Sequence, residues 1–240
     1  MESLKNDVAF PHTAWSLVAR AASAAPAERS AALESLLRRY LPALRVRLVV
    51  DKRIDEHKAE DLLQEFVAQK ILEQDLISRA DRDKGRFRTF VLTALDRYVI
   101  DRARFDTAAR RSAPHASPDA METVASHEPE PSAAFELQWA RQVIDEAARR
   151  MHANCQKTGR IDLWQLFRCR VLDPALEGAD PEPYECLIHR FGFTSPVVAS
   201  NALVTAKRMF ERNLRSVVGE YAGGEADIDR EIAELRQLVG

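Results

Sequence analysis

Cysteine is scarce in this chain of 240 residues, which has only Cys155, Cys169 and Cys186 and no CxxC pair. An odd and scattered set argues against a disulfide framework and indicates reduced thiols. The six histidines do not cluster with the cysteines at the spacing of metal ligands, so we expect no structural metal site and no cofactor.

Long hydrophobic runs are also missing. No stretch approaches the ~18 apolar residues of a membrane span, and the N-terminus lacks the basic and apolar regions of a signal peptide. We therefore expect a cytoplasmic protein with no membrane partner. Hydrophobic residues make up 46% of the chain and charged residues 30%, a composition that can bury a globular core.

Net charge is small, at −2, but it is unevenly distributed. Residues 82–111 contain nine Arg or Lys and four Asp, a local net charge of +5. Nucleic-acid binding depends on such a local patch rather than on the charge of the whole chain.

Strand-like alternation and internal repeats are absent, whereas apolar residues recur at helical steps of three and four. The pattern predicts an all-α chain, in which Pro42 kinks or divides a helix over residues 27–50. Further helices are expected over residues 58–72, from about 86 to 111, 134–156, around 164–171, 184–190, 196–218 and 225–239.

The domain boundary is predicted at a segment of biased composition. Residues 112–134 have four prolines, four acidic residues and no Lys or Arg, which is typical of a flexible linker. The predicted organisation is a lead-in at residues 1–27, a helical domain at 28–111, the linker at 112–134, a second domain at 135–220 and a C-terminal amphipathic helix at 221–240.

An acidic helix provides the first candidate site, since the helical period places several polar residues on the face opposite its apolar stripe. These carboxylates have no histidine or metal partner, and no nucleophile or phosphate-binding loop occurs elsewhere, so we expect no enzyme activity. The candidate docking residues are Glu60, Asp61, Gln64 and Glu65.

A basic helix follows about twenty residues later. Steps of eleven and seven residues place Arg86, Arg97, Arg104 and Arg111 within roughly 40° of each other, as a row that can follow a phosphate backbone. Phe105 and Tyr98 could stack on exposed bases. Alternatively, the arginines form a solvated face that is paired with Asp96, Asp101 and Asp106.

A helix-turn-helix is predicted near the C-terminus, where a short helix precedes a Phe-Gly-Phe turn at residues 191–193. Ser195 followed by Pro196 is a helix start signal. The same outline also occurs as a plain packing unit. The candidate DNA contacts on the second helix are Ser200, Asn201, Thr205, Lys207 and Arg208.

Three segments follow one another along the chain: AEDLLQEF at 59–66, KGRFRTFVLTALDRYVIDRAR at 84–104 and YECLIHRFGFTSPVVASNALVTAKRMFERNLR at 184–215. In this order they resemble an extracytoplasmic-function (ECF) sigma factor of bacterial RNA polymerase. HTAWSLVARA at 12–21 and DIDREIAELRQLV at 227–239 resemble a planctomycete and myxobacterial subgroup. The resemblance implies two helical domains, like sigma regions two and four.

The resemblance also implies roles for individual residues. Asp61, Gln64 and Glu65 match positions that dock on the polymerase β′ clamp, and residues 73–85 match the loop that captures a flipped base. The helix of residues 196–215 matches the reader of the minus-thirty-five element. The positions that match the helix binding the melted minus-ten element are Arg86, Arg88, Arg97, Arg102 and Arg104.

The expected function is therefore that of a sigma factor, which binds polymerase core through the β′ clamp and the β flap and opens promoter DNA. An anti-sigma factor or another regulator is a further expected partner. Two alternatives remain: a helix-turn-helix DNA-binding regulator that does not act through polymerase, and a degenerate sigma-like protein-interaction module.

Overall fold

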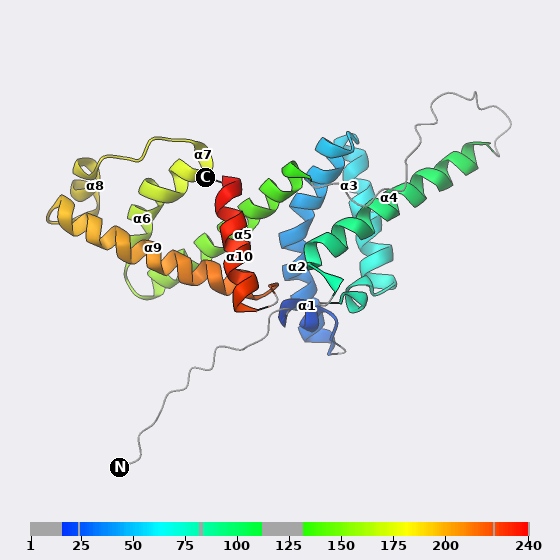
Figure 1. Ribbon diagram of the computed structural model, residues 1–240, viewed down its shortest axis with the longest axis horizontal. Coiled ribbons are helices and arrows are strands. Elements are labelled where there is room, and N and C mark those ends of the chain that lie inside the picture. The colour runs from blue at the N-terminus through cyan, green and yellow to red at the C-terminus, as the bar shows by residue number, and fades with distance from the viewer. Residues whose placement is uncertain (1–15, 24, 82–83, 112–131, 223, 240) are drawn as a thin grey trace, which may run out of the picture. The chain divides into compact units, whose positions relative to one another are not determined.

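The computed structural model describes residues 16–23, 25–81, 84–111, 132–222 and 224–239. Within these ranges every regular element is a helix and no strand occurs, which confirms the all-α prediction (Figure 1). No helix in this part of the chain is long and apolar enough to cross a membrane. The contacts divide residues 18–238 into an N-terminal unit, Val18–Ile144, and a C-terminal unit, Asp145–Leu238.

Helices of two lengths build the part of the chain up to Ile144. The long ones are α2 (Pro26–Val46), α4 (Phe87–Arg111) and the first half of α5 (Ala133–Lys157). The others are α1 (Ser16–Ala21), α3 (Glu56–Phe66), the 3₁₀ turn η3 (Leu76–Arg79) and the π-helical turns η1 (Arg47–Asp51) and η2 (Val67–Glu73).

Local signals explain where α2 and α3 begin. Pro26 lies in the first turn of α2, where its missing N–H costs no hydrogen bond. The helix continues through Pro42, so of the two predicted outcomes, a kink or a division, the division is excluded. Asp55 caps α3 by accepting the backbone N–H of His57 at 3.0 Å and that of Lys58 at 3.4 Å. This cap starts α3 two residues before the predicted Lys58.

The core of the N-terminal unit forms around Tyr40 on α2. Its ring stacks on Trp139 of α5 with centroids 4.4 Å apart and meets the edge of Phe87 of α4 at 5.3 Å. Trp139 is fully buried, as are Phe66 of α3 and Leu95 of α4. Four helices therefore contribute to one apolar core.

The start of α5 belongs to this same unit, although the sequence places the domain boundary at residue 134. The Ser132 hydroxyl accepts the backbone N–H of Phe135 at 2.9 Å and donates to the Asp51 carboxylate. Most of the predicted linker lies outside the described residues. Its two flanks, Arg111 and Ser132, are both in the N-terminal unit, and the division by contacts falls after Ile144.

The C-terminal unit continues from α5 into a second set of helices. They are α6 (Ile161–Phe167), the π-helical turn η5 (Arg168–Leu172), α7 (Asp173–Glu177), α8 (Tyr184–Phe191), α9 (Pro196–Gly219) and α10 (Glu225–Val239). The limits of α8, α9 and α10 agree with the predicted helices to within a residue. α7 lies between the helices predicted around 164–171 and over 184–190, where the sequence predicted none.

A glycine turn and a serine cap set the pair α8 and α9. Gly192 has φ of 75°, a left-handed conformation that side chains disfavour, and it ends α8. The Ser195 hydroxyl then accepts the Val198 N–H at 3.3 Å, which confirms the predicted start of α9. Leu187 of α8 and Leu203 of α9 pack with Leu166 of α6 in one buried cluster.

Candidate functional site

Three of the four predicted docking residues lie on an exposed face of α3. Glu60, Asp61 and Gln64 are exposed, whereas Glu65 is half-buried. The Glu60 carboxylate lies 3.8 Å from the Nε atom of Arg45 on α2, a loose ion pair in solvent. The face therefore offers carboxylates and an amide that an incoming basic surface can reach.

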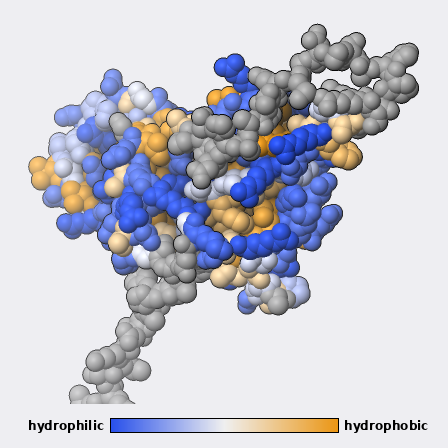
Figure 2. Space-filling model, turned by 45° about the vertical axis from the view of Figure 1, so that its right-hand side comes forward, coloured by the Kyte–Doolittle hydropathy of each residue, from blue (hydrophilic) through white to orange (hydrophobic). Residues whose placement is uncertain are grey.

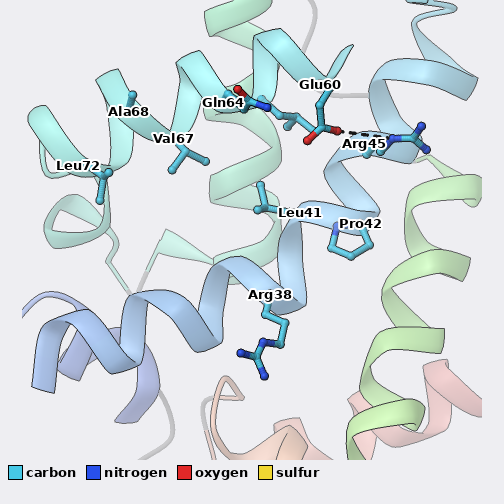
Figure 3. A pocket seen from close by; sticks show the side chains of 10 residues that line it. Arg38, Leu41, Pro42, Arg45, Glu60, Gln64, Val67, Ala68 and Leu72 are labelled. Atoms are coloured by element: carbon cyan, nitrogen blue, oxygen red, sulfur yellow. Dashed lines mark ion pairs between the residues drawn. The ribbon is translucent and has the colours of Figure 1, made fainter. Parts of the chain in front are cut away.

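Beside this face runs a groove of about 660 Å³ between α2 and the helical stretch of α3 and η2 (Figure 3). Leu41, Leu63 and Val67 contribute to its apolar lining, and Leu72 at one end is 54% exposed. Glu60 and Gln64 line the same groove. The sequence did not predict the groove, because α2 and η2 meet only in the folded chain.

Glu65 points toward α4 rather than to solvent. Its carboxylate accepts the Tyr98 hydroxyl at 3.0 Å and an N–H of Arg102 at 3.3 Å. Burial, followed by the hydrogen bond to Glu65, raises the pKa of Tyr98 to about 12. A predicted docking residue and a predicted DNA-binding residue are thus partners in one ion pair.

The outer face of α4 carries arginines and one aromatic ring. Arg97 and Arg104 are exposed, and Arg86 is exposed just before the helix begins. Phe105 is 66% exposed, and the Arg102 guanidinium lies 5.9 Å from the centre of its ring. The side chain of Arg111 lies outside the described residues.

Two charged residues of α4 are buried instead. Arg88 is 6% exposed and lies 3.2 Å from the carboxylate of Glu136 on α5. Asp96 accepts from Arg47 at 2.8 Å, with Lys52 at 3.6 Å. Burial alone would lower the pKa of Arg47, but its bonds to Asp96 and Asp51 raise it. Arg88 therefore lies away from the exposed row that contains Arg97 and Arg104.

The alternative, in which the arginines of α4 pair with acidic residues of the same helix, holds for only part of α4. Arg102 lies 3.6 Å from Asp106, and Arg104 lies 3.9 Å from Asp101. These contacts are exposed and long, so they contribute little stability. No described residue forms an ion pair with Arg97.

The connection before α4, at residues 73–85, is anchored to the unit. Asp75 has φ of 49° and binds Arg29 of α2 at 2.8 Å, while the Ile77 side chain is buried. Gly85 has φ of 125°, which favours glycine just before α4. Residues 82 and 83 of this predicted base-capture loop lie outside the described residues.

The predicted recognition helix α9 exposes every residue that was assigned to DNA contact. Its opposite face buries Ala199, Leu203 and Ala206, in contact with α6 and α8. The exposed set is Ser200, Asn201, Thr205, Lys207 and Arg208. The structure thus brings these five residues together on one side of a single helix.

Comparison with known proteins adds no relative: no family model matches the chain, and neither a curated protein nor a solved structure matches it.

Proposed function

We propose that the protein is a sigma factor, which binds RNA polymerase core and directs promoter recognition and melting. The observation that carries the proposal is the coupling of two faces in the N-terminal unit. The acidic face of α3 and the arginine face of α4 are on contacting helices, and Glu65 bonds to Tyr98 and Arg102 between them. A partner held on α3 therefore lies near a nucleic acid held on α4.

Docking on polymerase would combine charge with apolar contact. Glu60, Asp61 and Gln64 supply the polar part, and the groove supplies apolar surface through Leu41 and Val67. An amphipathic helix of the polymerase β′ clamp with basic side chains suits both features. Glu65 contributes by fixing the position of α4 relative to this surface.

Promoter opening would use the exposed face of α4. Extruding a base from the duplex costs a few kcal/mol, and stacking on an aromatic ring recovers about 1–3 kcal/mol per base. Phe105 is exposed for such stacking, while Arg97 and Arg104 can neutralise phosphates. This division of roles favours single-stranded over duplex DNA on α4.

The direct test is transcription in vitro with core polymerase and a library of promoters. A sigma factor yields initiation at defined sites, and a complete absence of promoter-dependent transcripts contradicts the proposal. Core binding without transcription points to the interaction module. Duplex binding without core binding points to a regulator that acts independently of polymerase.

Docking is tested separately with the double variant Glu60→Lys and Asp61→Lys. We expect at least a tenfold weaker affinity for core polymerase, roughly the cost of placing like charges against a basic partner. The matched control is Glu177→Lys with Asp180→Lys, which makes the same charge change at exposed residues of the C-terminal unit. Equal affinities of the two double variants would remove α3 as the docking site.

A further inference from the structure

Exposed apolar side chains are concentrated at the start of α9. Val197 is 69% exposed, Val198 44% and Val204 48%. They are three of the seven large apolar side chains exposed in the described residues. On the face of the molecule drawn in Figure 2, apolar residues form separate patches among mainly hydrophilic ones. α9 thus carries three such side chains, and no other described helix carries more than one.

Helical geometry aligns two of these valines with polar residues. Val197, Asn201, Val204 and Arg208 follow one another at steps of four, three and four, so they lie within about 60° around α9. All four are exposed. They lie opposite Leu203, which is buried against α8, so the stripe faces away from the core of the C-terminal unit.

The charges around the stripe favour a polyanion as its ligand. Lys207, Arg208 and Arg212 are exposed, and no described residue forms an ion pair with them. The one acidic residue of α9, Glu211, is bonded to Arg236 of α10 at 3.3 Å. The face thus has an excess of positive charge beside apolar side chains, which suits the major groove of duplex DNA.

We propose that α9 reads thymine methyl groups through Val197 and Val204, and an adenine through Asn201. In the major groove only thymine presents a methyl group, and an asparagine amide can bond both N6 and N7 of adenine. This inference rests on the promoter-binding part of the proposed function. It gives a role in base preference to the exposed valines, which cannot form hydrogen bonds with DNA.

The spacing of the valines fixes the expected pattern of bases. Seven residues of helix span roughly 10 Å, which equals about three base-pair steps at 3.4 Å each. The two thymines are thus expected about three base pairs apart, with the adenine read by Asn201 between them. Arg208 lies beyond Val204 and contacts a phosphate or a guanine at that end.

The test begins by selecting preferred duplexes from a randomised pool, with the full chain alone and with core polymerase. Deoxyuridine then replaces thymine at each selected position, which removes the methyl group and keeps the base pairing. We expect about a fourfold loss of affinity at each of two positions, the effect of one buried methyl-sized group. In Val197→Ala and Val204→Ala, the loss at the corresponding position disappears.

The control is Val50→Ala, since Val50 is 56% exposed in the N-terminal unit and should leave the methyl dependence unchanged. Thermal unfolding monitors the fold of each variant. No selected sequence under either condition, or equal affinity for thymine and deoxyuridine duplexes, overturns the inference. If core binding falls in the valine variants while duplex binding does not, α9 contacts a protein instead.

The same measurements separate this inference from the proposed function. A chain that reads methyl groups but never binds core keeps the inference and loses the sigma assignment. A chain that initiates transcription without dependence on thymine methyl groups keeps the sigma assignment and loses the inference.

Discussion

The Tyr98 hydroxyl donates a hydrogen bond to the Glu65 carboxylate at 3.0 Å, joining α4 to α3. Glu65 also accepts from Arg102, so one carboxylate connects the helix that we propose binds polymerase with the helix that we propose binds DNA. A change in either interface that moves Glu65 therefore acts on the other. In the proposed function Glu65 is therefore a positioning residue rather than a simple docking charge.

The bond to Glu65 predicts a pH dependence of stability. Burial and Glu65 raise the pKa of Tyr98 from about 10 to about 12, so folding favours the protonated phenol. The stabilisation is complete below about pH 10 and is lost as the pH rises toward 12. Thermal unfolding of wild type and Tyr98→Phe between pH 8 and about 11.5 should show a difference that shrinks with pH. A difference in stability that stays constant with pH contradicts this prediction. The control variant is Tyr184→Phe.

Trp139 predicts a second effect on the N-terminal unit. Trp139→Ala should destabilise that unit by about 3–5 kcal/mol, the usual cost of emptying a buried aromatic site. Urea unfolding followed by circular dichroism measures the change. Trp139→Phe preserves the stack on Tyr40 and should cost less. Equal losses in the two variants would show that the stack does not stabilise the unit.

Arg88 and Arg97 should differ in what they affect. Removing Arg88 leaves Glu136 without its partner, so Arg88→Met should lower stability, and a double variant with Glu136→Gln should recover part of the loss. Arg97→Ala should change stability by less than about 0.5 kcal/mol. It should instead lower the salt dependence of single-stranded DNA binding by about 0.7 in slope. If Arg88→Met lowers the salt dependence of DNA binding and Arg97→Ala lowers stability, the two arginines have the opposite roles.

The three cysteines should react in a fixed order with an alkylating reagent. Burial raises the pKa of Cys155 and of Cys169, and the thiolate is the reactive form. Cys186 is exposed, so it should be modified first, and Cys155, which is fully buried, last. Mass spectrometry of timed samples near neutral pH measures the order. Cys186→Ser should remove the fast phase, and a remaining fast phase would contradict the assignment.

The positions of the helices could be predicted from local sequence signals, whereas the buried ion pairs could not. Ser195 with Pro196 marks the start of α9 because cap and proline act within one turn. Asp55 is the same kind of signal for α3 and was readable in the sequence. In contrast, Arg47 and Asp96 are 49 residues apart, so their buried ion pair depends on tertiary packing.

The assignment of site residues shows the same limit. Asn201 and Arg208, which were predicted as contacts on the second helix, are exposed on α9, since this depends only on helical period and burial. The spacing could not show that Arg88 turns inward, because its partner Glu136 lies beyond the proline-rich segment. That segment suggested a separation of domains, and composition alone does not reveal that the chain returns to α2 through Trp139.

This return has a consequence for synthesis on the ribosome. A nascent chain that ends at Arg111 contains α2 and α4 but lacks Trp139 and Glu136. Tyr40 therefore lacks its stacking contact with α5, and Arg88 lacks its ion pair with α5. The N-terminal unit can complete its core only after residue 144 has emerged. Proteolysis of stalled chains should therefore show protection at a stall site beyond that point and not at one near residue 111.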